Sequence, residues 1–271
     1  MSADTVVWHY TSLEAVIAIL REKKLRFTRL DVFHDSDPFE GSVPKQQIDD
    51  QTPIFCGAQA TEMMLAGVAS HFPGMDVPRT QYRDPWGQMT KRRQAGIRST
   101  HAICWRWGDE SEAMWKLYCK DGRPGQGLAL RATLGKLETS VSNYDLYISP
   151  VQYRFLHEGA AFDNEIDPFL HKRKGFEYEQ EVRLLNHDET HYLALAQYLI
   201  DDASKAQPAE LPEYRFFDWS LVETIDAIAV SPYADEIYEL KVRDEITKIE
   251  PEIMSRIELS VLSERRYAIN L

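Results

Sequence analysis

Apolar residues recur with two different periods over the first thirty positions of the chain. Residues 6–10 form a short apolar and aromatic run that is typical of a strand. Apolar side chains between 13 and 20 then recur at i, i+3, i+4 and i+7, which indicates one face of a helix. Thr11 and Glu14 have the spacing of a capping box before that helix. Residues 25–28 read as a strand again, so we expect the order strand, turn, helix, strand.

The same reasoning predicts further elements along the chain. The strands that we expect span residues 101–107, 128–131, 147–155, 179–185, 225–230 and 257–262. One expected helix starts at a capping pattern over 109–112 and runs through Tyr118. Others lie at 190–200 and from about 233 to 249, and Met63, Met64 and Leu65 indicate another. Strands outnumber helices without strict alternation, which favours the α+β class. No glycine-rich phosphate-binding motif or nucleophile elbow occurs, which disfavours Rossmann, P-loop and α/β-hydrolase enzymes.

Residues 43–100 differ in amino-acid composition from the rest of the chain. They are rich in methionine, proline and glycine, and we interpret them as an insertion or lid within a single domain spanning residues 1–271. We expect the residues before them, from Asp35 to Gly41, to form a structural turn. A metal site there is disfavoured, because His34 and the aspartates lack further ligands at diagnostic spacing.

Composition narrows the class of protein. The chain has 271 residues, 44% of them apolar, and a formal net charge of −12. No apolar run approaches the roughly 20 residues that cross a bilayer, and no signal peptide is recognisable. The three cysteines favour reduced thiols and a cytoplasmic location. The negative charge favours a small molecule or a protein as partner over nucleic acid, although residues 91–93 and 172–174 are two small basic clusters.

Three groups of residues are candidates for chemistry. His9 lies on a strand just before a helix, where it could bind a ligand hydroxyl or simply be satisfied by a carbonyl. Glu179, Glu181 and Arg183 alternate on an expected strand and would share one face, either as a functional carboxylate pair or as an exposed charged edge. A third group, Trp105, Trp107, Trp115 and Tyr118, could stack on a flat heterocycle or belong to the core.

Four motifs occur together in one order. They are Trp8-His9-Tyr10-Thr11, Asp37-Pro38-Phe39-Glu40, Met114-Trp115-x-x-Tyr118 and Tyr178-Glu179-x-Glu181-x-Arg183. This set resembles an uncharacterised bacterial family of unknown function. The layout is also similar to the ADP-ribosyltransferase superfamily, including its DNA-modifying toxin branch. The resemblance implies a split β-sheet core with helices and a helical insertion.

The resemblance also implies roles for individual residues. Glu181 would be the catalytic carboxylate and Glu179 would assist the acceptor. The NAD-binding residues would be His9, Tyr10, Thr11, Trp105, Tyr118 and Arg183, with Arg183 orienting Glu181, and Lys172–Lys174 would meet the pyrophosphate. Tyr10 stands where the superfamily has glycine.

The activity implied is transfer of ADP-ribose from NAD, as substrate, to a protein, nucleic acid or small-molecule acceptor, as a toxin or phage-defence effector with a partner or immunity protein. The alternatives are an NAD glycohydrolase and an inactive binding or sensing module of the same fold. A glycosidase ranks last, because carboxylates two apart on one strand point the same way and cannot flank a scissile bond.

Overall fold

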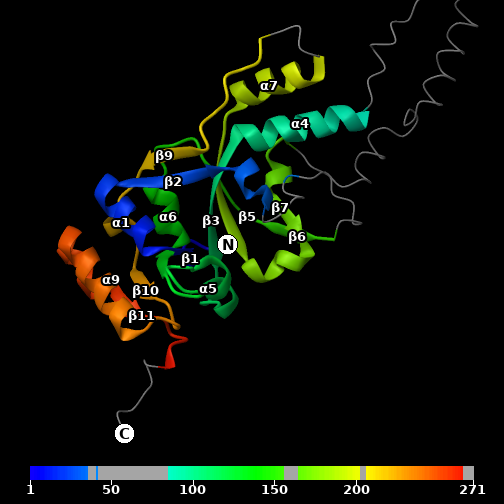
Figure 1. The fold of residues 1–271 in the computed structure, drawn as a ribbon. Coiled ribbons are helices and arrows are strands. Elements are labelled where there is room, and N and C mark those ends of the chain that lie inside the picture. Colours follow the sequence, from blue (N-terminus) through cyan, green and yellow to red (C-terminus); the bar gives the residue numbers. More distant parts are fainter. Residues whose placement is uncertain (36–40, 42–84, 156–163, 202–205, 265–271) are drawn as a thin grey trace, which may run out of the picture.

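The computed structural model describes residues 1–35, 41, 85–155, 164–201 and 206–264 (Figure 1). Within these ranges the core is a nine-stranded sheet. Its strands are β1 (Val6–Thr11), β2 (Lys24–Arg29), β3 (Thr100–Trp107), β4 (Leu128–Thr133), β5 (Tyr147–Pro150), β8 (Glu181–His187), β9 (Tyr214–Asp218), β10 (Ala227–Val230) and β11 (Ile257–Leu259). A second sheet pairs β6 (Gln152–Arg154) in parallel with β7 (His171–Arg173).

Helices cover this sheet on both faces. The α-helices are α1 (Leu13–Glu22), α4 (Pro85–Ser99), α5 (Glu112–Tyr118), α6 (Leu134–Ser140), α7 (Glu189–Asp201), α8 (Leu221–Thr224) and α9 (Glu236–Ile249). Short 3₁₀ helices are η1 (Leu30–Asp35), η3 (Asp167–Leu170), η4 (Lys174–Glu179) and η5 (Pro251–Arg256). Strands and helices mix without regular alternation, and the sheet is mostly antiparallel, so the α+β class is confirmed.

Strand β3 is the branch point of the large sheet (Figure 1). One edge of β3 pairs with β8 along its whole length, from Thr100 to Arg106. The other edge pairs with β2 near its start, at Ala102, and with β1 near its end, at Arg106 and Trp107. Strands β1 and β2 therefore diverge from different halves of β3, and the sheet divides between them.

The two faces of the sheet bury different apolar clusters. The larger core lies on the face of Val7 and Trp105, where α1, α6 and α9 pack. On the opposite face, α5 covers Trp8 and Tyr10. Beyond it, a third cluster packs residues of α4 and η3 against Leu185 of β8. Because side chains alternate along a strand, β1 and β8 each contribute to both faces, and the polar residues of β8 lie between the clusters of the second face.

Several predicted boundaries are wrong for local physical reasons. Ser12, not Thr11, caps α1, because its side chain accepts from the amide of Ala15 while Thr11 still belongs to β1. The strand expected at 147–155 is interrupted between β5 and β6. The strand expected at 179–185 begins only at Glu181, because Gln180 has a left-handed φ of 43° that ends η4.

Some predictions fall outside the described residues. The expected helix at Met63–Leu65, the Asp37–Glu40 motif and most of the 43–100 segment belong to this group. The part of that segment that is described, α4, packs along α7 and was not predicted. Within the described ranges, no helix has the length and apolar character that crossing a membrane requires.

Candidate functional site

A single ammonium group joins the two predicted carboxylates. The Nζ of Lys172 lies 2.6 Å from Oε2 of Glu179 and 2.8 Å from Oε2 of Glu181. Both glutamates are buried, with 4% and 3% of their surface exposed. The interpretation of this segment as an exposed charged edge is therefore wrong, because burial of paired carboxylates needs compensating charge, and Lys172 supplies it.

Glu179 reaches this cluster from a different element than the sequence predicted. It is the last residue of η4, whereas Glu181 opens β8, so the two do not share a strand face. The left-handed turn at Gln180 redirects the chain between them. The carboxylates nevertheless meet, because both turn toward Lys172 on β7.

The mid-chain tyrosine also belongs to the cluster. The hydroxyl of Tyr118, at the end of α5, donates to Oε1 of Glu179 at 2.6 Å. The residue is 47% exposed although its hydroxyl is engaged. Ser111 starts α5 by accepting from the amide of Met114, and buried Trp115 packs the helix against β1. Cap and packing together place Tyr118 over η4.

Glu181 has polar contacts on several sides. Arg183 Nε donates to Oε1 of Glu181 at 2.6 Å, and Arg183 Nη1 donates to the carbonyl of Phe169 at 2.7 Å. The thiol of Cys104 is a further hydrogen-bond partner of the carboxylate. The amide of Glu181 donates to the hydroxyl of Tyr153 at 2.8 Å. Arg183 is itself buried, and its bonds to the carboxylate and to the carbonyl of Phe169 fix the orientation of Glu181.

These contacts set the ionisation of the cluster. Burial alone would raise the pKa of Glu181, but Arg183 and Lys172 outweigh it and hold that pKa well below its usual range. Burial would lower the pKa of Lys172, but Glu181 and Glu179 outweigh it and raise the pKa. Burial and the charge of Glu179 raise the pKa of Tyr118. At neutral pH the cluster therefore holds ionised Glu181, cationic Lys172 and a neutral phenol.

His9 lies at the division of the sheet. Its Nδ1 donates to the carbonyl of Cys104 at 2.9 Å, where the pairing of β1 with β3 has ended. Its ring lies 5.3 Å from that of Trp105. Cross-strand pairing puts Trp8 on the face of Glu181, so His9 belongs to the opposite face. Burial lowers the pKa of His9, which keeps the ring neutral.

The link from His9 to the acid is indirect. The main chain of Cys104 accepts from His9 while its thiol bonds to Glu181, so one residue of β3 joins the two. Of the two interpretations of His9, the structure shows the one in which a main-chain carbonyl satisfies the imidazole. The imidazole borders the division of the sheet, and β3 lies between its strand and β8, which carries Glu181.

Three predicted NAD-binding residues lie outside the cluster. Trp105 is 1% exposed and packs in the larger core, so it offers no open ring face. Tyr10 is buried edge-on against Trp115, and its hydroxyl accepts from the amide of Ser111. Burial raises the pKa of Tyr10 to about 12. The carbonyl of Thr11 is a hydrogen-bond acceptor for the Cys119 thiol. These contacts are of the kind that stabilise a fold.

Two residues of the cluster were missed or misassigned by sequence reasoning. Lys172 was predicted to meet a pyrophosphate, but its ammonium is enclosed by the two carboxylates. Tyr153 was read only as part of a strand, and it supports the amide of Glu181. The register of β6 with β7 places Tyr153 directly opposite Lys172. No local sequence pattern announces that pairing.

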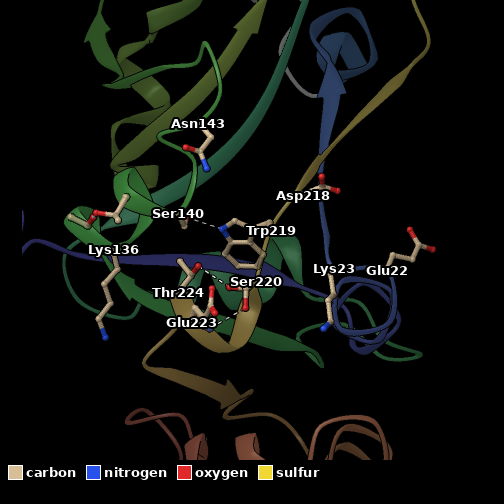
Figure 2. Close-up of a pocket in the computed structure, with 12 residues that line it drawn as sticks. Glu22, Lys23, Lys136, Ser140, Asn143, Asp218, Trp219, Ser220, Glu223 and Thr224 are labelled. Atoms are coloured by element: carbon tan, nitrogen blue, oxygen red, sulfur yellow. Dashed lines mark hydrogen bonds between the residues drawn. The ribbon is translucent and has the colours of Figure 1, made fainter.

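A separate hollow of about 810 Å³ lies near Trp219. Figure 2 shows the indole of Trp219 with Ser140 on one side and Lys23 on the other. The indole Nε1 donates to Ser140 at 2.9 Å, and the hydroxyl of Thr224 donates to the carbonyl of Ser220 at 2.8 Å. None of the residues that line this hollow belongs to the carboxylate cluster. The candidate site is the cluster, because buried ionised groups converge there with a half-exposed aromatic residue, Tyr118.

The described residues contain no group of three histidine, cysteine or acidic side chains placed to hold a metal ion. Comparison of the chain with protein-family models, curated proteins and solved structures found no match.

Proposed function

We propose that this protein is an NAD-dependent ADP-ribosyltransferase whose site is the cluster of Tyr118, Glu179 and Glu181. One observation carries the proposal. Tyr118 and Glu179, 61 positions apart, are joined by a hydrogen bond, and Lys172 joins Glu179 to Glu181. Tyr118, Glu179 and Glu181 are the positions that the ADP-ribosyltransferase-like motifs indicate. The divided sheet around β3 supports the same reading of the fold.

The residues suit cleavage of the bond between nicotinamide and ribose. When this bond breaks, its electron pair leaves with nicotinamide and positive charge develops on the ribose, as in glycoside cleavage. The ionised Glu181 would stabilise that charge, and such electrostatic stabilisation is often the largest catalytic contribution. The acceptor would then bond to the ribose carbon and lose its proton to Glu179.

One further residue of the cluster would hold the substrate. Tyr118 is about half exposed, and its ring would stack on nicotinamide. His9 lies on the opposite face of the sheet from Glu181 and donates through Nδ1 to the carbonyl of Cys104, so it would support the site through β3 and would not contact the ribose.

The test is Glu181→Gln in an assay of nicotinamide release from NAD. We expect the rate to fall by about a hundredfold to a thousandfold, the usual effect of losing one preorganised group. The matched control is Glu177→Gln, because Glu177 lies on the adjoining η4 but is exposed and pairs with Lys174. Circular dichroism would verify that both variants fold. Cleavage by folded Glu181→Gln at the wild-type rate would eliminate the mechanism.

The deep burial of Glu181 beside two cations favours a second candidate, a binding module that does not catalyse. In that case the charged cluster would stabilise the fold, and no NAD would bind. Calorimetry with millimolar NAD separates the two functions, since an absent heat signal favours the module. If NAD is cleaved, labelled NAD and a cell extract distinguish transfer from simple hydrolysis, which releases only free ADP-ribose.

A further inference from the structure

We propose that Lys172 is a positioning residue that holds the carboxylates of Glu179 and Glu181 close together, so that both can act in the proposed reaction. This inference rests on the proposed function. It assigns Lys172 a role through the two carboxylates, without contact to the substrate.

The contacts of Lys172 support this role. Its side chain is 11% exposed, and its ammonium lies within 3 Å of an oxygen from each glutamate, at 2.6 and 2.8 Å. The ammonium also lies 5.4 Å from the centre of the Phe176 ring. A buried lysine with two carboxylates and an aromatic ring around it has little freedom to serve a phosphate.

The small β6–β7 sheet delivers Lys172 to this place. Tyr153 on β6 stands opposite Lys172 on β7, and both contact Glu181. Tyr153 supports the backbone amide of Glu181 while Lys172 holds its carboxylate. The second sheet therefore fixes the first residue of β8 at two points.

Charge explains why Lys172 matters to both carboxylates. Arg183 also compensates Glu181, whereas the ion pair described for Glu179 is with Lys172. The titratable and charged groups facing the pair are Lys172 from β7, Arg183 from β8, Cys104 from β3, Tyr153 from β6, Tyr118 from α5 and Tyr178 from η4. Arg106, the cross-strand neighbour of Glu181, donates instead to Gln180. Without Lys172, two close carboxylates would repel and one would retain a proton at higher pH.

The experiment measures the pH dependence of nicotinamide release from NAD by Lys172→Met, Lys172→Arg and the wild type. We expect kcat of Lys172→Met to fall more than its KM rises. The acidic limb of its pH profile should move up by about one to three pH units, the effect of an adjacent opposite charge. Lys172→Arg keeps the charge and should hold that limb near the wild-type position. Lys248→Met is the control and should behave as wild type, because Lys248 is exposed on α9 and pairs with Asp244.

The outcomes separate this inference from the proposed function. No cleavage by the wild type would overturn the proposed function, and the positioning role with it. An active wild type together with an unshifted acidic limb in Lys172→Met would overturn the positioning role alone. If Lys172→Met does not fold, Lys172→Gln replaces it, because glutamine removes the charge but keeps a hydrogen-bond donor. We expect the same upward shift of the acidic limb in Lys172→Gln. An unshifted limb in this variant would likewise overturn the positioning role.

Discussion

The phenol of Tyr118 donates a 2.6 Å hydrogen bond to Oε1 of Glu179. The bond joins the last residue of α5 to the last residue of η4. Because α5 packs on β1 and η4 leads directly into β8, this contact ties together the two sides of the branch strand β3. The position of Glu179 thus depends on packing more than fifty residues earlier in the chain.

Tyr118→Phe removes this hydrogen bond and leaves one carboxylate oxygen without its donor. We expect the free energy of unfolding to fall by about 1.5 kcal/mol, the lower end for a bond to a charged acceptor, because the residue is half exposed. Urea unfolding measures the change. Tyr147→Phe is the control, since Tyr147 is equally exposed on β5 and should change stability little. Equal stability of both variants would contradict a stabilising bond.

Glu181 makes stability depend on pH in the acid range. Its folded pKa is lowered, so its contribution is fully present above the usual carboxyl pKa of about 4.3 and is lost as pH falls toward the folded value. At pH 7 we expect Glu181→Gln to lose about 3–5 kcal/mol, because Arg183 and Lys172 stay buried without this anion. Urea unfolding of both proteins between pH 7 and 3 tests this. The gap between them should narrow as pH falls, and a constant gap would contradict the assignment.

His9 contributes a second, separate pH dependence. Burial lowers the pKa of His9 in the folded state. Below about pH 6.5 the unfolded chain therefore binds a proton at His9 that the folded protein does not bind. The free energy of unfolding consequently decreases as the pH falls below about 6.5. His9→Asn keeps a donor for the carbonyl of Cys104 but cannot be charged. We expect a shallower decline in unfolding free energy between pH 6.5 and 5 than in the wild type. His101, His171 and His187 contribute to the remaining slope, because burial lowers their pKa values as well. An unchanged slope in His9→Asn would show that His9 does not titrate as described.

Local patterns predicted the elements with strong periodicity. The helix at Leu13–Glu22 and the strands at Thr100–Trp107 and Leu128–Thr133 lie where apolar spacing placed them. Elements without such a pattern were missed. Helix α4 carries the basic run 91–93 and has little apolar periodicity, and its stability comes from packing on α7. Strand β9 is only five residues long and is specified by pairing with β2.

In the candidate site too, local motifs predicted some residues, whereas tertiary contacts placed the others. Glu179, Glu181, Arg183 and Tyr118 could be chosen from the sequence because their motifs are short and contiguous. Lys172 was assigned to a different partner, since adjacent positive charges look alike in a sequence whether they are solvated or enclosed. The left-handed turn at Gln180 was also unpredictable, because non-glycine residues seldom adopt that conformation.

Side-chain chemistry and periodicity are local properties, so the order of residues was enough to predict the α+β class, the main elements and the acids at the centre of the site. The enclosure of Lys172 between two glutamates, the placement of His9 across the sheet from them and the burial of Trp105 depend on contacts between residues far apart in the chain. Such contacts follow from strand register and from the paths of connecting segments. Those features emerge only when the whole chain minimises exposed apolar surface and unpaired polar groups together.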